Sequence, residues 1–543
     1  MLKSTIKGLL EDALKTLDVR DVEIEIEKPA DSQHGDFSTN IAMKLARVLR
    51  KAPLLIAKNI VATLPKTDGI AKVDVAPPGF INFYLDARVY HPVVHEINRL
   101  GEAYANLNTG KGQHINIEFV SANPTGYLHI GHARGAAAGD AMARIMKKAG
   151  YRVTKEFYVN DGGNQITTLA QSIDARYKQL FDHDVPMPKD GYHGAEIKAI
   201  AARIKAEFGD RFLHEDGFDY FKERGVRELL AGLKRDLEAF GVSFDVWYHE
   251  TTLYETKAID KTLAILREKG YIYEKDDAHW LKTSDFSDEK DRVIIKSDGT
   301  YTYLLPDIAY HHDKLSRGYT HLIDILGGDH HGYVPRLKAA IKMISGKDGM
   351  LDVDILQMVK VMQDGKEITQ SKRSGKSITL ADLISEVGKD PIRYFFAMRS
   401  LNTHMELDLD LALRQTNENP VYYAQYAHAR IASVLREADS RGIKLDLSPR
   451  DFTRLGGAKA DALMATLAEY KDVVGEAAEK RLFHRIPQYI HRLASTLHSY
   501  YADTKVLTED LTTTTERLAL MHAVKVILKD ALTLVGVDAI ERM

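Results

Sequence analysis

Two histidines and a glycine stand close together near residue 130 of the chain. Residues 115–139 open with an alternating apolar run typical of a strand, break at a Pro and a Gly, and continue as His129-Ile-Gly131-His132 before an alanine-rich run. A strand end, a loop and a helix N-terminus therefore meet at the two imidazoles. Free N–H groups and the helix dipole favour an anion such as a triphosphate there. We expect His129 and His132 to donate to its oxygens and Gly131 to let a nucleotide approach the backbone.

A second stretch with chemical potential is 365–380, which is basic, rich in hydroxyl groups and contains glycine. It lies between a predicted strand and a predicted helix, and its Lys372 and Arg373 can close over phosphates and neutralise charge in a transition state. Each stretch alone has a simpler interpretation. The first can be a helix start with two half-buried histidines, and the second a solvated basic turn.

The elements that must position these groups alternate between strand and helix from about residue 111. This alternation predicts a parallel sheet with crossover helices, whose ligands bind at the carboxyl ends of the strands. The groups delivered there are Glu118 to Asn123, Asn160, Asp161, Asp329 to His331, and the segment after Val361. Asp329, His330 and His331 are the place to look for a metal. We expect no metal held by protein side chains, because these residues are adjacent and lack a spaced histidine partner.

Periodicity and turn residues predict the individual elements. Strands are expected at 22–26, 80–85, 152–159, 320–326 and 353–361, with a hairpin at 293–304 turning at Asp298-Gly299. Helices are expected at 38–50, from about 165, from about 306, at 335–344 and at 381–387. Residues 181–250 are mostly helical with polar faces and are interpreted as an insertion. Beyond about 400 the period is helical throughout, with helices at 420–436, 459–479, 483–504 and 512–534.

Length and composition bound the protein class. The chain has 543 residues, of which 44% are apolar and 28% charged, a globular composition that implies about three domains. The absence of cysteine excludes disulfides, thiolate chemistry and cysteine-ligated zinc. The N-terminus looks like an amphipathic helix that contains acidic residues, and no apolar run approaches membrane-span length, so neither secretion nor a membrane span is supported. A net charge of −3 neither indicates nor excludes nucleic acid.

Four separated segments, in the right order, give the chain a family resemblance. His129-Ile-Gly131-His132 matches the HIGH motif of class I aminoacyl-tRNA synthetases letter for letter, and residues 121–141 are similar to the bacterial arginine-specific members. Residues 371–375 (SKRSG) resemble the KMSKS loop of that class. Residues 419–430 (NPVYYAQYAHAR) and 32–46 (SQHGDFSTNIAMKLA) resemble the start of the anticodon-binding domain and the extra N-terminal domain of the arginyl-tRNA synthetases.

The resemblance implies a fold and a reaction. It implies an α/β protein with a Rossmann-like parallel-sheet catalytic domain at 111–400, a small N-terminal α/β domain at 1–110 that contacts tRNA, and a C-terminal all-helical anticodon-binding bundle at 401–543. It implies ATP-dependent formation of arginyl-adenylate, with release of pyrophosphate, and transfer to the terminal adenosine of tRNA(Arg). Activation would itself need tRNA. The partners would be tRNA(Arg), L-arginine and ATP with Mg²⁺, with no DNA and no membrane, in a cytoplasmic monomer.

The resemblance also implies residue roles. His129, Gly131, His132, Lys372 and Arg373 would be catalytic, and Asn123, His129, Gly131, His132, Ser371 and Lys372 would bind ATP. Arginine would be bound by Glu118, Ser121 and Asn123 at its backbone end and by Tyr303, Asp307 and Asp329 at its guanidinium. Carboxylates suit a planar charged guanidinium, and a site built for its hydrogen bonds rejects lysine by roughly 10⁴ without editing. Tyr426 and Arg430 are the candidates for tRNA contact.

The chain departs from the family pattern at one place. The first half of the KMSKS loop is Thr369-Gln370 instead of Lys-Met, so Lys372 is the only lysine in the two lysine positions of the motif. Some arginine enzymes that lack the loop lysine carry one just before HIGH, where this chain has Gly126. The sequence therefore predicts an enzyme that relies on Lys372.

Two other functions compete with this interpretation. One is another HIGH-type nucleotidyltransferase, such as a cysteine-specific ligase, although the chain lacks zinc-binding cysteines. The other is a non-catalytic RNA-binding protein that keeps the fold. Intact His129, Gly131, His132 and Lys372 argue against the second alternative.

Overall fold

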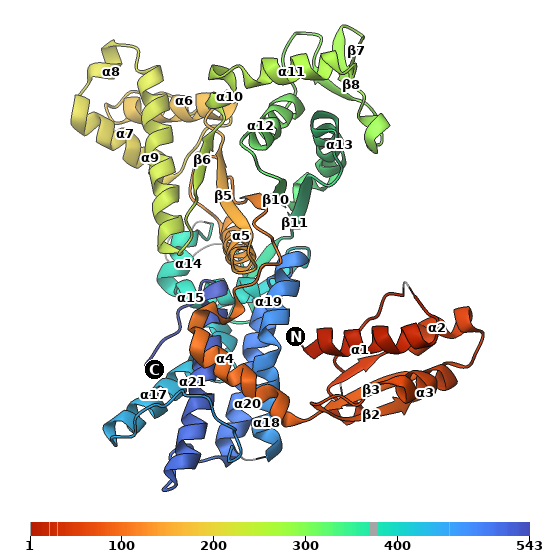
Figure 1. Cartoon of the computed structure of the whole chain (residues 1–543). Helices are drawn as coiled ribbons and strands as arrows, with labels where there is room; N and C mark the ends of the chain where they lie inside the picture. Colours follow the sequence, from red (N-terminus) through yellow and green to blue (C-terminus); the bar gives the residue numbers. More distant parts are fainter. Residues whose placement is uncertain (1, 21, 30, 370–376, 456) are drawn as a thin grey trace. The chain divides into compact units, whose positions relative to one another are not determined.

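The structure, a computed structural model, describes residues 2–20, 22–29, 31–369, 377–455 and 457–543 (Figure 1). The chain divides into two units. The first consists of Met1–Leu100, Gly442–Ala468 and Ser499–Ala523, and the second of Gly101–Arg441, Glu469–His498 and Val524–Met543. Within the described residues, no helix is both long and apolar enough to cross a bilayer.

The first unit contains a three-stranded antiparallel sheet covered by helices. Its strands are β1 (Phe37–Thr39), β2 (Ile70–Ala76) and β3 (Phe80–Leu85), in the order β1-β3-β2. Its helices include α1 (Leu2–Thr16), α2 (Ile41–Leu49), α3 (Pro53–Thr63), α4 (His91–Leu100) and α18 (Gly457–Ala468). The predicted strand at 80–85 is confirmed.

Two predictions for the first unit are wrong in detail. Residues 22–26 form no strand, and only a single bridge joins Glu27 to Ser38. The alternation instead reflects burial, since Ile24 packs into the core with α1, α2 and α3. The helix predicted at 38–50 begins at Ile41, because the preceding residues pair with β3.

The second unit is built on a parallel sheet, as predicted, and this sheet has five strands. Its strands are β4 (His114–Glu118), β5 (Arg152–Val159), β6 (Val246–His249), β10 (His321–Gly327) and β11 (Leu351–Leu356), in the order β11-β10-β4-β5-β6. All four pairings are parallel, so the five carboxyl ends lie at one edge. The polar residues that follow β4, β5, β6 and β10 therefore converge there.

Helix α5 (Ile130–Lys148), which follows β4, packs on the sheet and is buried along most of its length (Figure 1). The small residues of the sequence explain this close approach. A Cβ added at Gly139 would lie 2.3 Å from the ring of Phe119 at the end of β4, so only glycine fits there. The alanine-rich run is thus the face by which the helix reaches the sheet.

Two groups of helices flank the sheet (Figure 1). One consists of α6 (Gly163–Gln179), α7 (Ala195–Phe208), α8 (Arg211–His214) and α9 (Phe218–Ala239), which share an apolar core. The other consists of α10 (Thr251–Glu255), α11 (Ala258–Glu268), α12 (Leu304–Ser316), α13 (Val334–Ser345) and the hairpin strands β7 (Ile272–Lys275), β8 (Ala278–Leu281) and β9 (Arg292–Ile295). The insertion predicted at 181–250 therefore extends too far, since 246–249 form β6.

The strand predicted at 353–361 is two strands in different sheets. The chain leaves β11 at Leu356 and re-enters as β12 (Val359–Gln363), which pairs with β13 (Lys366–Ile368) and β14 (Met405–Asp408) in the order β13-β12-β14. The break falls at Gln357, whose N–H donates to the carbonyl of Leu401 instead of to a sheet neighbour. The apolar run alone gave no sign of this break.

The rest of the second unit is helical apart from β14. The remaining helices of the chain are α14 (Leu380–Glu386), α15 (Lys389–Ala397), α16 (Leu409–Leu413), α17 (Pro420–Ser440), α19 (Tyr470–Glu479), α20 (Arg485–Asp503) and α21 (Leu511–Leu534). The prediction of helix throughout after 400 is wrong at β14. The single helix predicted at 459–479 is two helices, since α18 ends at Ala468 and α19 begins at Tyr470.

Candidate active site

The two predicted histidines meet at the N-terminus of α5. His129 is the residue before the helix, and its Nδ1 accepts the Gly131 N–H at 3.1 Å, while Nδ1 of His132 accepts the His129 N–H at 3.2 Å. The rings stack with centroids 3.7 Å apart. Because each Nδ1 is an acceptor, each neutral ring carries its proton on Nε2, which is left to donate.

Electrostatics keep both rings neutral. Desolvation lowers the pKa of His129, and burial together with the adjacent His129 lowers the pKa of His132 to about 3. Two uncharged N–H donors thus stand at the positive end of a helix, where an anion is favoured. A Cβ at Gly131 would lie 3.0 Å from Cε1 of His129, so glycine also makes room for the stacked ring.

The backbone between β4 and α5 is strained. Val120 and Ser121 have φ of 70° and 40°, a left-handed conformation that is unfavourable for a β-branched residue such as valine. The Ser121 hydroxyl holds this turn, since it donates to Oε1 of Glu118 at 2.9 Å and accepts the Tyr158 N–H at 3.0 Å. The turn aims the chain from the sheet edge toward the histidines.

Glu118 lies at the end of β4, but its carboxylate already has internal partners. Oε2 accepts from the buried Lys314 ammonium at 2.5 Å and from the Tyr310 hydroxyl at 2.8 Å, and Oε1 accepts from Ser121. Lys314 also donates to Asp324 at 3.1 Å. The structure therefore brings two predicted arginine ligands, Glu118 and Ser121, together in a buried ion-pair network.

Asp307 lies in the first turn of α12, where the Tyr333 hydroxyl donates to its Oδ2 at 2.5 Å. Burial raises the pKa of Asp307, and the nearby Glu118 and Asp324 carboxylates raise it further. Glu250 follows β6, and its carboxylate interacts electrostatically with the Tyr158 hydroxyl. Burial first, and then the Asp307 and Asp161 carboxylates, raise the pKa of Glu250. Among the described residues, no ion pair joins Asp307 or Glu250 to a lysine or arginine.

Sequence reasoning missed Glu250, Tyr158 and Tyr333. Glu250 comes directly after β6, a strand that the sequence placed inside the helical insertion, so its position at the sheet edge was hidden. Tyr333 closes the short turn 328–333 after β10, and its relation to Asp307 arises only in the folded chain. If 246–249 had been assigned as a strand, Glu250 would have been predicted at the carboxyl edge of the sheet, where ligands bind.

The other predicted arginine ligands lie in more open positions. Asn123 donates to Oε1 of Gln165 at 2.7 Å. The Tyr303 side chain is 91% exposed, one turn before Asp307, and the Asp329 side chain is exposed beside His330. The Asp307 N–H donates to the Tyr303 carbonyl at 3.3 Å in the first turn of α12. Within the described residues, no side-chain hydrogen bond or ion pair connects Tyr303 or Asp329 to Asp307, so the structure does not bring these two side chains into the carboxylate group.

Ser371, Lys372 and Arg373 lie outside the described residues, but the chain on either side of 370–376 is described. Before it, β13 pairs with β12. After it, Thr379 forms a bridge with His129, and the Leu380 N–H donates to the Leu128 carbonyl at 2.8 Å. The chain at Thr379 and Leu380 thus lies against the histidine turn.

In the described ranges, no group of three or more His, Asp or Glu side chains is arranged to hold a metal ion.

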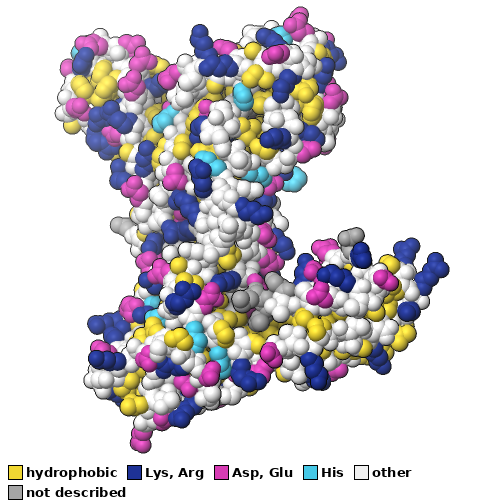
Figure 2. All heavy atoms as spheres, viewed as in Figure 1, with side chains coloured by type: hydrophobic (Ala, Val, Ile, Leu, Met, Phe, Trp, Pro, Cys, Tyr) yellow, Lys and Arg dark blue, Asp and Glu magenta, His cyan; other side chains and the backbone are white. Residues whose placement is uncertain are grey.

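On α17, Tyr426 stacks on Tyr422 with the ring planes 5° apart, and the Arg430 guanidinium lies 5.8 Å from the Tyr426 ring centroid. On the face shown in Figure 2, basic and acidic side chains are interspersed.

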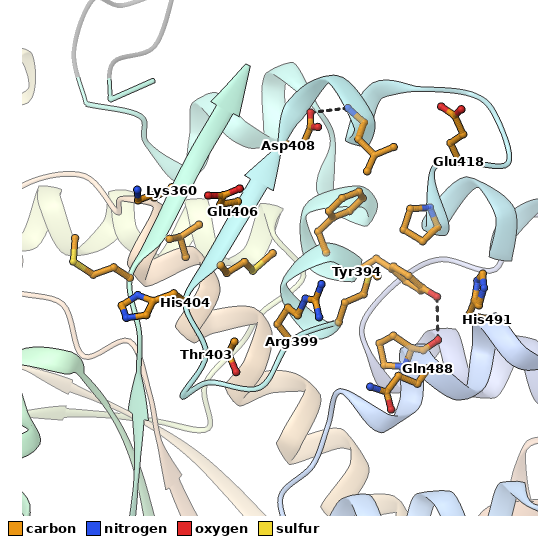
Figure 3. Close-up of a pocket in the computed structure, with 18 of the residues that line it drawn as sticks. Lys360, Tyr394, Arg399, Thr403, His404, Glu406, Asp408, Glu418, Gln488 and His491 are labelled. Atoms are coloured by element: carbon orange, nitrogen blue, oxygen red, sulfur yellow. Dashed lines mark hydrogen bonds between the residues drawn. The ribbon is translucent and has the colours of Figure 1, made fainter. Parts of the chain in front are cut away.

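A cavity of about 1170 Å³ lies away from these groups. Figure 3 shows its walls, which come from β12, β14, α15 and α20 and include Lys360, Arg399, His404, Glu406 and Gln488. The Tyr394 hydroxyl donates to the Pro487 carbonyl at its edge. None of the predicted site residues lines this cavity, so its size alone does not mark the reactive centre.

Three family models match the chain. The arginyl-tRNA synthetase N-terminal domain matches residues 2–85, the catalytic domain of class I (R) tRNA synthetases matches 96–395, and the DALR anticodon-binding domain matches 424–543. The catalytic-domain model alone covers more than half of the chain.

Individual proteins agree with these models. The arginine–tRNA ligase of Bacillus licheniformis is 50% identical over 100% of this chain and 98% of that protein. The crystal structure of an arginyl-tRNA synthetase from Campylobacter jejuni, titled putative, matches with a TM-score of 0.78 and 35% identity over 84% of this chain and 100% of that chain. The arginyl-tRNA synthetase of Thermus thermophilus shares the fold, with a TM-score of 0.79 and 21% identity over 100% of both chains. The chain therefore belongs to the arginyl-tRNA synthetase family of class I.

Proposed function

We propose that the protein joins L-arginine to tRNA(Arg) in two steps, forming arginyl-adenylate from arginine and ATP and then transferring the arginyl group to the terminal adenosine of the tRNA. One observation carries the arginine specificity. Asp307 and Glu250 are partly buried carboxylates with raised pKa values and no ion pair to a lysine or arginine among the described residues. A guanidinium supplied by the substrate would neutralise both.

The carboxylates are held so that they can receive a planar cation. The Tyr333 hydroxyl donates to Oδ2 of Asp307, and the Tyr158 hydroxyl interacts with the Glu250 carboxylate. The remaining oxygens can take the paired N–H groups of arginine. A lysine ammonium would leave part of this arrangement unpaired, and such a mismatch lowers kcat/KM for lysine relative to arginine by roughly 10⁴. We retain Tyr303 and Asp329 as candidate walls, and Ser121 and Asn123 as candidate ligands of the amino-acid backbone.

Glu118 cannot bind the arginine ammonium as a free carboxylate. Its oxygens already accept from Lys314, Tyr310 and Ser121. We propose that it attracts the arginine ammonium while it fixes the Ser121 turn. The ammonium would then share an oxygen that already has a partner, instead of taking an empty one.

Activation itself calls for positioning and charge stabilisation more than covalent chemistry. The arginine carboxylate attacks the α-phosphorus of ATP and pyrophosphate leaves. We propose that Nε2–H of His129 and of His132 donates to phosphate oxygens, with Gly131, Asn123 and Ser371 completing the ATP site. Lys372, helped by Arg373, would neutralise the departing pyrophosphate. Mg²⁺ would arrive with ATP as part of the substrate.

The tRNA-facing parts are proposed from the domain order. We divide the chain into an N-terminal tRNA-contacting domain (1–110), a catalytic domain (111–400) and a helical anticodon-binding domain (401–543), a division supported by the three family models. Tyr426 and Arg430, a stacked tyrosine and its neighbouring cation, suit unpaired RNA bases. We further propose a cytoplasmic monomer whose arginine activation requires tRNA, with no DNA or membrane partner.

The test is ATP–pyrophosphate exchange with arginine, with and without total tRNA, and with lysine and cysteine as control amino acids. We expect exchange only when arginine and tRNA are both present. Exchange with arginine in the absence of tRNA would keep the ligase and remove the tRNA requirement. Exchange with cysteine would favour another nucleotidyltransferase, and tRNA binding without exchange would favour a non-catalytic RNA-binding protein.

A further inference from the structure

Arg134 stands two residues beyond His132 on α5, and its side chain is fully buried. Burial lowers the pKa of its guanidinium to about 10, so it still carries a charge at neutral pH. Within the described part of the chain, no carboxylate pairs with it. A buried cation without a counter-ion is costly unless its hydrogen bonds are well satisfied.

Arg393 offers a comparison within the same unit. It is also fully buried, but its Nη2 pairs with the Asp140 carboxylate at 2.7 Å. Arg393 therefore follows the usual rule that a buried charge is paired with an opposite charge. Arg134 has no such partner among the described residues, and its hydrogen-bond acceptors explain why it is buried there.

The partners of Arg134 are three backbone carbonyls from two segments far along the chain. Nη1 donates to the carbonyl of Gln357 at 2.7 Å, and Nη2 donates to those of Ser400 and Thr403, each at 2.8 Å. Hydrogen bonds to main-chain carbonyls constrain the position of the backbone itself, and they do so whatever side chains the two segments carry. One guanidinium thus fixes two segments relative to α5.

These segments lead into neighbouring parallel strands. Gln357 lies two residues before β12, and Ser400 and Thr403 lie in the connection from α15 to β14. The two strands pair from Val359 opposite Met405, and Figure 3 shows Lys360 and Glu406 on them, with Thr403 in the connection. Arg134 therefore hydrogen-bonds to the segments that lead into β12 and β14, at the end of the sheet β13-β12-β14 where these two strands begin.

A second link joins the same helix to the chain beyond this sheet. Leu128 and His129, at the start of α5, contact Leu380 and Thr379 through backbone hydrogen bonding. The sheet and the start of α14 are thus both tied to the first turns of α5. Of the two links, Arg134 is the one made by a side chain, so it is the one that substitution can test.

We propose that Arg134 is a positioning residue that fixes the sheet β13-β12-β14 relative to α5, and so holds the α5 histidines in the place that the ATP phosphates require. This inference rests on the proposed ATP-dependent activation. The guanidinium is required for its geometry, because a planar fork can donate to carbonyls of two segments at once. A lysine ammonium is a single point and cannot replace that fork.

The role predicts a loss confined to one step. Adenylate formation needs the phosphate-binding groups in place, and a misplacement of about 1 Å lowers such a rate by roughly 10²-fold. Transfer of the arginyl group to tRNA involves no pyrophosphate. A residue that serves only stability would change both steps in proportion to the amount of folded enzyme.

The test compares Arg134→Lys with wild type in the full chain. Arginine-dependent pyrophosphate exchange is measured per active site, with sites counted by titration, alongside arginyl-tRNA formation from chemically supplied arginyl-adenylate. We expect exchange to fall by at least about tenfold, with transfer changed less than about threefold. Arg393→Lys is the matched control, and we expect a lower Tm with the ratio of the two rates unchanged.

Each other outcome is decisive. If folded Arg134→Lys keeps the wild-type ratio of the two rates, the positioning role is wrong. If that variant is insoluble, Arg134→Gln, which buries no charge, is measured in the same way. If neither folds, Arg134 serves the fold as a whole and the proposal fails. A wild-type protein without arginine-dependent exchange would instead overturn the proposed function.

Discussion

Replacing Asp307 with asparagine should weaken arginine use and stabilise the protein at the same time. Burial raises the pKa of the Asp307 carboxyl, so the folded chain takes up a proton there more readily than the unfolded chain. The charged form is therefore a cost to folding at pH values above the folded pKa, and the cost disappears as the pH falls through that pKa. Asp307→Asn keeps the shape and removes the charge.

The size of the activity loss follows from what remains in the site. Removing one partner of a desolvated charge pair costs about 2–5 kcal/mol. Glu250 would remain as a second carboxylate, and the Tyr333 hydroxyl would still have an amide oxygen to which it can donate. We therefore expect the lower part of the range, about 2–3 kcal/mol, or roughly 30- to 160-fold in kcat/KM for arginine.

The assay is pyrophosphate exchange over a range of arginine concentrations, combined with thermal unfolding at pH 7. Asp288→Asn is the control, because Asp288 is ion-paired with Arg292 in a different part of the unit. It should lower Tm and leave KM for arginine unchanged, the opposite pattern. A change of less than about threefold in kcat/KM for folded Asp307→Asn would refute the guanidinium assignment.

Three further predictions concern the phosphate site and the core. Lys372→Ala should lower exchange by roughly 10²- to 10³-fold while tRNA binding, measured by filter retention, stays within about twofold; equal loss of both would count against a role in catalysis. Because burial and His129 lower the pKa of His132 to about 3, kcat/KM for ATP should show no inflection from this ring between pH 6 and 8, and an inflection that His132→Gln abolishes would contradict this. Asp140→Asn leaves Arg393 buried without its carboxylate and should cost about 3–5 kcal/mol in urea unfolding. Since its cationic neighbours lower the pKa of Asp140 to about 2, this contribution should be present above about pH 4 and fade as the pH falls toward 2, and a pH-independent effect would be inconsistent with it.

Local patterns were enough to predict the frame of the catalytic unit. Strands at 80–85 and 152–159, helix starts near 165 and 335, and the parallel direction of the strands follow from periodicity and turn residues, which act over a few positions. His129, Gly131 and His132 are of this kind as well. Their chemistry depends on one loop and one helix N-terminus, both of which are encoded within about twenty residues.

Breaks in a pattern that are caused by distant partners could not be predicted. The apolar run at 353–361 divides at Gln357 because that residue bonds Leu401 and Arg134, which lie elsewhere in the chain. Strand β6 is only four residues long and follows a helical insertion, so its apolar residues resembled the end of a helix. The misplaced strand then hid Glu250.

The sequence by itself determined the family, the position of His129 and His132 at a helix start, and the apolar, small-residue face that places α5 on the sheet. Only the tertiary structure decided which carboxylates are paired with a cationic side chain. Glu118 is neutralised by Lys314, almost two hundred positions away. Asp307 and Glu250 come together from different strands and helices, and among the described residues neither forms an ion pair with a lysine or an arginine. The physical reason is that charge and desolvation depend on distance in space. Sequence patterns record neighbours along the chain, and only the fold brings these groups within reach of one another.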